Sequence, residues 1–326
     1  DPNPLYSSSS WQSLIPSSTP LSNLYIPGTH ESLATRFSLF GTKCQSLSIR
    51  QQLLNGIRFF DFRLRLDEDS GELLAYHGFL PMGSDLGSVL GRVYEFLESE
   101  EGEGETIIIS FKQENTSNPL FASTLLELLR ERKDVWYFEN RWPTLGEVRG
   151  KCVLFCRFDF DAGLGLHPID WPFDSNQVWE TDIGGKRLQV QDWHGISSFL
   201  SLPLKSSLIL SLFPPTTTSS KFRINYLSCS SPNPFSFGFP QFCAEGFLAS
   251  RWWVERGWGF KGINELVLEG LAAREGEGEG EKQGEEGEEE EKGEGMVVMM
   301  DYCEFPRGGE LVKKVIGMNF RGSLES

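Results

Sequence analysis

Apolar side chains follow two different spacings along the chain. Between Leu86 and Leu97 they recur every three or four residues, the spacing of a helix with one buried face. Elsewhere, short runs of β-branched, aromatic and other apolar residues, such as Thr106–Lys112 and Lys151–Arg157, are typical of buried strands. The pattern therefore predicts a protein that contains both helices and strands.

The same criteria predict eight strands with helices between several of them. The strands are expected at residues 24–26, 57–66, 72–76, 106–112, 151–157, 187–192, 222–228 and 296–302. The helices are expected at residues 46–55, 86–97, 120–132, 263–273 and 309–316. This alternation favours a parallel α/β fold, and eight strands fit a TIM-type barrel. A doubly wound open sheet is the alternative, but no glycine-rich phosphate loop follows the first strand.

The sequence predicts a single domain preceded by a short lead-in. Residues 1–20 are rich in Ser and Pro and predict an extended segment before a single domain at 21–326. Residues 275–295 form a Glu/Gly tract that cannot bury apolar surface, so we expect a disordered acidic insertion before the last strand. The tract holds much of the net charge of −16. The acidic balance argues against a nucleic-acid partner.

Membrane and metal signals are sparse in the sequence. No apolar run reaches the roughly 18–20 residues that span a bilayer, and no signal-peptide pattern opens the chain. We expect a soluble chain or one peripheral to a membrane surface, and secretion stays open. Trp252, Trp253 and Trp258 could provide transient membrane-surface contact or could be buried. The six cysteines show no zinc-binding spacing.

Ionisable residues lie within the second predicted strand and at the ends of most of the others. They are His30, Asp61, Arg63, His77, Lys112, Arg157, Asp192 and Asp301. Because the carboxyl ends of parallel barrel strands meet at one face, we expect these side chains to share a site. Asp61 and Arg63 would be solvated on an ordinary half-exposed strand, but in a barrel such charges are costly unless paired or functional.

The residue types fit the cleavage of a phosphodiester by an internal hydroxyl. This reaction needs one group to take a proton, another to donate one, and a cation to face the phosphate. Two imidazoles, His30 and His77, can exchange protons near neutral pH. The planar guanidinium of Arg63 can contact two phosphate oxygens. A lone histidine is more often structural, and it is the combination that favours catalysis.

At these positions the sequence resembles the X domain of bacterial-type phosphatidylinositol-specific phospholipase C. The matching stretches are Ile26–Ser32, Gly56–Arg63, Tyr76–Gly78, Thr106–Lys112, Gly150–Arg157 and Val190–Asp192. Their order and spacing agree from about residue 21 to 193, and Met300–Tyr302 resembles the last strand of the family.

The resemblance implies an irregular eight-stranded barrel and cleavage of phosphatidylinositol through a cyclic inositol phosphate, with diacylglycerol released. It implies that His30 is the general base, His77 the general acid and Asp301 the group that orients His30. Arg63 would stabilise the phosphorane, so neither a metal nor a cofactor is expected. The residues that would hold the inositol are Lys112, Arg157, Asp192 and His194.

Two positions depart from the family pattern. Glu31 stands where bacterial members have Asp, and it is expected to reach His77 or Arg63 as a catalytic residue despite its extra methylene. His194 falls near the place of an aromatic ring that packs on the inositol.

Two alternatives stay open. One is a metal-dependent glycerophosphodiesterase or sphingomyelinase-D-like enzyme, which would need a carboxylate cluster that Arg63 interrupts. The other is a catalytically weak protein that binds a lipid headgroup at the same place.

Overall fold

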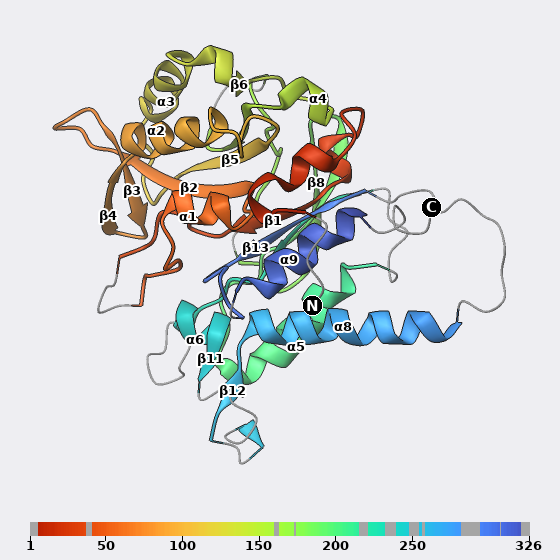
Figure 1. Cartoon of the computed structure of the whole chain (residues 1–326). Helices are drawn as coiled ribbons and strands as arrows, with labels where there is room; N and C mark the ends of the chain where they lie inside the picture. Colours follow the sequence, from red (N-terminus) through yellow and green to blue (C-terminus); the bar gives the residue numbers. More distant parts are fainter. Residues whose placement is uncertain are drawn as a thin grey trace.

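A computed structural model of the chain shows a curled β-sheet with helices packed around it (Figure 1). The structure describes residues 6–36, 41–159, 163–172, 174–214, 221–231, 239–247, 254–255, 258–281, 294–306 and 308–320.

The main sheet has eleven strands, most of which pair in parallel. The strands are β1 (Tyr25–Thr29), β2 (Phe59–Leu66), β3 (Leu73–His77), β4 (Leu80–Asp85), β5 (Thr106–Gln113), β6 (Trp136–Tyr137), β7 (Lys151–Arg157), β8 (Trp179–Ile183), β9 (Lys186–Gln191), β10 (Phe222–Tyr226) and β13 (Met296–Met300). Their order is β6-β7-β5-β2-β1-β13-β10-β9-β8, with β3 and β4 attached to β2. A separate antiparallel pair is formed by β11 (Gly246–Phe247) and β12 (Phe260–Lys261).

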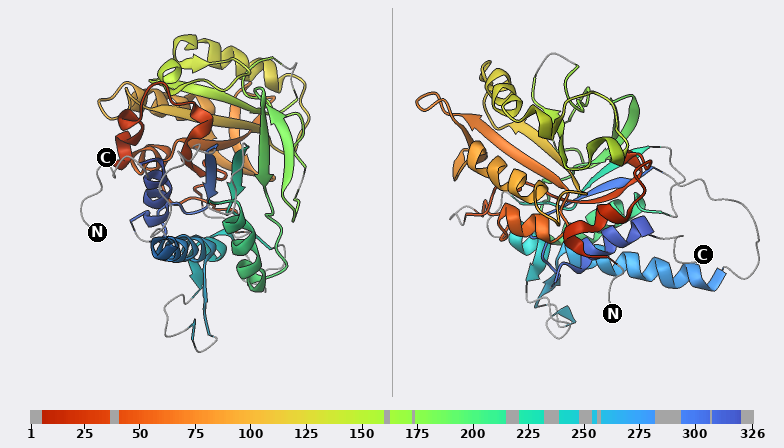
Figure 2. Two further views of the ribbon diagram at one scale, coloured as in Figure 1. Left: turned by 90° about the vertical axis from the view of Figure 1, so that its right-hand side faces the viewer. Right: turned by 45° about the horizontal axis from the view of Figure 1, so that its top comes forward.

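The helices lie in two groups beside this sheet. The α-helices are α1 (Ile49–Leu54), α2 (Leu86–Leu97), α3 (Phe121–Arg130), α4 (Leu145–Val148), α5 (Leu202–Ser211), α6 (Pro240–Glu245), α8 (Ile263–Glu281) and α9 (Glu310–Gly317). The 3-10 helices are η1 (Ser8–Leu14), η2 (Leu21–Asn23), η3 (Lys133–Val135), η4 (Phe199–Ser201) and η6 (Met318–Phe320). α2 and α3 contact the β3 region, whereas α5, α8 and α9 lie together near β1 (Figures 1 and 2).

The parallel α/β character predicted from the sequence is confirmed, but the sheet differs from the expected barrel. From β6 to β9 every neighbouring pair is parallel, whereas β8 joins β9 in an antiparallel pair. Among the described residues, no strand pairing joins β6 to β8 or β9, so this part of the chain forms a curled open sheet.

The third predicted strand does not run in the expected direction. β3 pairs antiparallel to β2, and β4 then pairs antiparallel to β3. The sequence analysis missed β4. The residues between β2 and β3 are too few for the crossover that a parallel neighbour needs, so the chain turns back on itself.

The structure also differs from the prediction in the lead-in at residues 1–20 and in the tract at residues 275–295. The expected extended lead-in contains η1, where Trp11 is fully buried and donates through Nε1 to the carbonyl of Gly56 at 3.0 Å. The expected loop at 275–295 begins as a continuation of α8 to Glu281. Extending an existing helix avoids the cost of nucleation, and glutamate favours helix. Residues 282–293 of the predicted insertion lie outside the described residues.

Candidate active site

Three cations stand side by side on adjacent strands, Arg63 within β2 and the other two at the carboxyl ends of β5 and β7. Arg63 on β2 is in register with Lys112 on β5, and Lys112 is in register with Arg157 on β7. All three line one cavity of about 520 Å³. Alternation along the strands gives neighbouring residues at one level the same orientation, so the register itself produces this row of positive charge.

Arg63 is held by two carboxylates. Its Nη1 donates to Glu31 Oε1 at 2.6 Å, and its Nε donates to Asp61 Oδ2 at 3.0 Å. Burial works against the charge of Arg63, but Glu31 and Asp61 together hold its pKa well above the ordinary value. The guanidinium is therefore a permanent cation in a fixed orientation.

His30 connects this guanidinium to a buried carboxylate. It follows β1, and its Nδ1 donates to Asp301 Oδ1 at 2.9 Å. Its Nε2 lies 2.8 Å from Arg63 Nη2, which can only donate, so Nε2 carries the lone pair. Burial lowers the pKa of His30 well below 6.5, and the nearby charge of Arg63 lowers it further. His30 is thus neutral and a proton acceptor at neutral pH.

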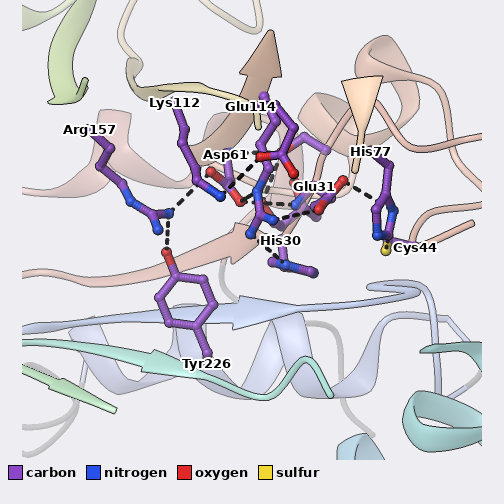
Figure 3. Close-up of polar contacts among 12 residues, drawn as sticks. His30, Glu31, Cys44, Asp61, His77, Lys112, Glu114, Arg157 and Tyr226 are labelled. Carbon is purple, nitrogen blue, oxygen red and sulfur yellow. Dashed lines mark hydrogen bonds and ion pairs between the residues drawn. The ribbon is translucent and has the colours of Figure 1, made fainter. Parts of the chain in front are cut away.

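His77 reaches the same cavity from the opposite direction. Since β3 runs antiparallel to β2, its last residue returns toward the middle of β2. His77 Nδ1 lies 2.7 Å from the carbonyl oxygen of Thr42 and 3.2 Å from Glu31 Oε2 (Figure 3). With Nδ1 donating to these oxygens, Nε2 is the nitrogen left for exchange with a substrate.

Glu31 links the two halves of this arrangement. One carboxylate oxygen contacts Arg63 and the other contacts His77. Its backbone has φ of 42°, in the left-handed region that non-glycine residues seldom adopt. Burial raises the pKa of the Glu31 carboxyl, and the charge of Arg63 opposes this shift. The longer side chain thus makes both contacts that the sequence led us to expect.

The far side of the cavity is built around Arg157. Its Nη1 donates to the hydroxyl of Tyr226 at 3.1 Å, and its guanidinium lies 4.0 Å from the ring centre of Trp171. Trp171 Nε1 donates to Asp192 Oδ2 at 3.1 Å, and His194 Nδ1 lies 3.7 Å from Asp192 Oδ1. Aromatic faces and paired charges occupy this side.

All nine residues predicted for the site line this cavity. They are His30, Glu31, Arg63, His77, Lys112, Arg157, Asp192, His194 and Asp301. The sequence analysis did not assign Glu114, Trp171, Asp174 or Tyr226 to the site. Glu114, which bonds Lys112 at 3.0 Å, stands two residues after it and could have been found from strand alternation. Trp171 and Asp174 lie in an irregular segment whose position has no simple sequence signal.

Two groups of side chains in the cavity bear on metal binding. The carboxylates of Glu31, Asp61 and Glu114 contact Arg63 or Lys112, so cations of the protein already occupy them. Among the described residues, His30, Cys44 and Asp301 place ligand atoms within 4.8 Å of one another.

Residues 17–158 match the family described as phosphatidylinositol-specific phospholipase C, X domain. The matched part of the chain carries His30, Arg63 and His77. The chain is 33% identical over 196 residues to a 1-phosphatidylinositol phosphodiesterase of Listeria monocytogenes, an alignment that covers 56% of this chain and 60% of the relative. It is 30% identical over 199 residues to a Staphylococcus aureus protein of the same name, covering 56% and 63%. The chain thus spans less than two thirds of these relatives in sequence.

Solved structures extend the likeness of the fold beyond that region. The phosphatidylinositol-specific phospholipase C of Listeria monocytogenes has a TM-score of 0.66 at 22% identity, covering 96% of this chain and 98% of that one. A structure of the Staphylococcus aureus enzyme has a TM-score of 0.72 at 22% identity, covering 95% and 97%. At such identities the comparison shows the fold, over a length that includes β10, which ends at Tyr226, and β13, which Asp301 follows.

The tryptophans named from the sequence are only partly described. Trp252 and Trp253 lie outside the described residues, whereas Trp258 is 70% exposed. No helix of the described part of the chain is both long and apolar enough to cross a membrane.

Proposed function

We propose that this protein cleaves the phosphodiester of phosphatidylinositol-type lipids without a metal ion, giving diacylglycerol and a cyclic inositol phosphate. One observation carries the proposal. The neutral nitrogen of His30 lies against the guanidinium of Arg63, and the other ring nitrogen is fixed by Asp301. A proton acceptor and a phosphate-binding cation are thereby placed at the same point.

His30 would act as the general base. Its Nε2 takes the proton of the inositol 2-hydroxyl as that oxygen forms a bond to phosphorus. Asp301 stabilises the resulting imidazolium through Nδ1–H, the role that carboxylates have beside catalytic histidines. Arg63 would exchange its bond to Nε2 for bonds to the phosphoryl oxygens, whose negative charge grows in the transition state.

His77 would act as the general acid. It protonates the diacylglycerol oxygen as the bond from phosphorus to that oxygen breaks, so the proton removed by His30 is matched by one that His77 delivers. Glu31 contacts both His77 and Arg63 and would hold acid and cation at a fixed separation. Such alignment matters because a displacement of about 1 Å can cost about 10²-fold in rate.

The remaining charged groups would bind the inositol ring. Lys112, Arg157, Asp192 and His194 line the same cavity and offer both donors and acceptors to hydroxyl groups. The cavity volume of about 520 Å³ is in the range of small-molecule sites.

The decisive experiment is an assay on phosphatidylinositol vesicles with and without EDTA. We expect equal activity in both, with inositol 1,2-cyclic phosphate as the first product, because Arg63 supplies the cation. His30→Ala is the control for contaminating activity. Activity that is lost in EDTA and restored by calcium or magnesium would support the metal-dependent alternative. Vesicle binding without any product would support a headgroup-binding protein.

We also propose that the protein acts at a membrane surface, through Trp258 among other residues. Trp258 is 70% exposed, and tryptophan is favoured at bilayer interfaces. The similar Staphylococcus aureus enzyme is one whose membrane binding has been modulated. Trp258→Ala should weaken sedimentation with vesicles while the cleavage of a water-soluble inositol phosphodiester stays unchanged. Equal loss in both assays would contradict this contact.

A further inference from the structure

A buried thiol lies between the two histidines of the site. Cys44 is fully buried, and its Sγ lies 3.8 Å from His77 Nδ1 (Figure 3). Its backbone is fixed on both sides, since its N–H donates to Ala34 O at 2.9 Å and its carbonyl accepts from Tyr302 N at 2.8 Å. The proposed reaction gives this thiol no task.

The atoms around Cys44 form a set of metal ligands. A nitrogen of His30, the sulfur of Cys44 and a carboxylate oxygen of Asp301 all lie within 4.8 Å of one another. His77 Nδ1 lies 3.8 Å from the sulfur but donates to Thr42 O and Glu31, so it is not counted among the ligands. Ligand atoms of a tetrahedral zinc ion lie roughly 3.3–3.6 Å apart, given bonds of about 2.0–2.3 Å. The separations here are close enough for side-chain rotation to bring them to that geometry.

We propose that this cluster is an inhibitory zinc site, in which Zn²⁺ binds to His30, Cys44 and Asp301. Imidazole, thiolate and a single carboxylate are ligands that favour zinc. Calcium and magnesium prefer six or more oxygen ligands, so this cluster discriminates against them.

Charge balance supports a divalent ion at this place. Zinc binding releases to solvent the thiol proton of Cys44 and any proton that the Asp301 carboxyl carries, and the resulting thiolate and carboxylate neutralise the two positive charges of the ion. A neutral complex avoids the cost of an unpaired buried charge.

Inhibition depends on which ring nitrogen of His30 coordinates the zinc ion. Asp301 contacts Nδ1, so zinc at this position binds Nδ1. The ring proton of neutral His30 then resides on Nε2, which can no longer accept the proton of the substrate hydroxyl. The present 2.8 Å hydrogen bond from Arg63 Nη2 to His30 Nε2 would also be lost, because Nε2–H and Nη2–H are both donors. The inhibitory effect rests on the function proposed above, whereas zinc binding itself does not.

Binding is tested first, without turnover. The EDTA-treated full-length protein is titrated with zinc chloride in a calorimeter, and with cobalt chloride in a spectrophotometer. We expect one zinc per chain at this site and a sulfur-to-cobalt charge-transfer absorption in the near ultraviolet. Cys44→Ser should bind zinc at least about a hundredfold more weakly, since losing even an outer-shell partner costs about 10–100-fold. Cys156→Ser removes another buried thiol that lines the same cavity and should bind zinc like the wild type.

Inhibition is then measured on phosphatidylinositol vesicles. Zinc should abolish cleavage in wild type and Cys156→Ser, EDTA should restore it, and Cys44→Ser should resist the same zinc concentration. Circular dichroism checks that each variant is folded, and Cys44→Ala serves if the serine variant is not. Absent cobalt–sulfur absorption, or zinc affinity unchanged in the folded Cys44 variant, would overturn the site. Zinc bound through Cys44 without inhibition would overturn its placement on His30. Absence of activity in every sample would count against the proposed function and leave the binding result standing.

Discussion

Two arginines of the β2 region are both paired with carboxylates, yet Arg58 is fully buried whereas the side chain of Arg63 is 15% exposed. Arg58, just before β2, donates through Nε to Glu105 at 2.9 Å and through its other nitrogens to backbone carbonyls of Ser9, Leu53 and Ile57. Arg63 lies within β2 and faces the cavity. Its guanidinium contacts the side chains of Glu31, Asp61 and His30.

The two guanidinium groups differ in whether their N–H donors can reach a ligand. The partners of Arg58 are one carboxylate and three fixed carbonyls, which take four of its five N–H donors, and its full burial keeps it away from any ligand. Burial lowers the pKa of Arg58 despite Glu105, whereas two carboxylates keep that of Arg63 well above its ordinary value. Arg58 ties η1 and α1 to the strand, while Arg63 keeps its charge at an open face. The ion pair of Arg58 with Glu105 thus stabilises the fold, whereas the ion pairs of Arg63 hold its guanidinium in place at the cavity.

The largest expected effect is on stability, in Arg58→Met. Removing one partner of a buried pair typically costs about 3–5 kcal/mol because the other charge stays buried. Here Glu105 would keep only its bonds from the backbone amides of Gln12 and Ser13. Urea unfolding should show this loss, while the folded fraction keeps its rate on phosphatidylinositol. A loss of rate with unchanged stability would contradict the contrast between the two arginines.

Arg63→Ala should have the converse effect, on rate. Loss of one preorganised donor costs about 10²–10³-fold, or about 2.7–4 kcal/mol in the activation barrier. Arg63→Lys should recover only part, because a point charge cannot make the two-point contact of a guanidinium. Steady-state kinetics on vesicles measures both, with urea unfolding as the control. Full recovery by lysine would show that charge alone suffices.

The smallest effect concerns the pKa of His30. Burial and then Arg63 lower this pKa below 6.5, and a general base works only when neutral. Activity should therefore persist above the pKa and fall as the pH drops through it, so the acid limb of kcat/KM should lie below pH 6.5.

Arg63→Gln should raise the pKa of His30, whereas Arg58→Met should leave it unchanged. An NMR titration of the imidazole protons can measure this, since the chain has four histidines and His30→Asn assigns the signal. Equal shifts in both variants would mean that Arg63 has no special influence on His30.

The local sequence pattern was sufficient to predict the bounds of elements in which apolar residues recur at one regular spacing or form one continuous run. The apolar stripe predicted α2 at its observed bounds, and β7 also has the predicted bounds. Predicted ends were wrong where a neighbour decided them. The helix after Leu47 begins at the capping box of Ser48 and Gln51 and not at Ser46, because a cap requires reciprocal bonds that only the folded turn provides.

For the site, the predicted strands supplied seven of the nine predicted residues that line the cavity, and the family resemblance added Glu31 and His194. Side-chain alternation is a local property and decides on which face of its strand a residue lies, whereas the register that aligns Arg63, Lys112 and Arg157 in one row is a feature of the folded sheet. Tertiary structure decided the rest. It brought His77 back along an antiparallel β3, placed Cys44 between the histidines, and separated the roles of Arg58 and Arg63. The physical reason is that burial and the partners of a charge come from segments distant in the chain, and no local spacing encodes which of them will meet.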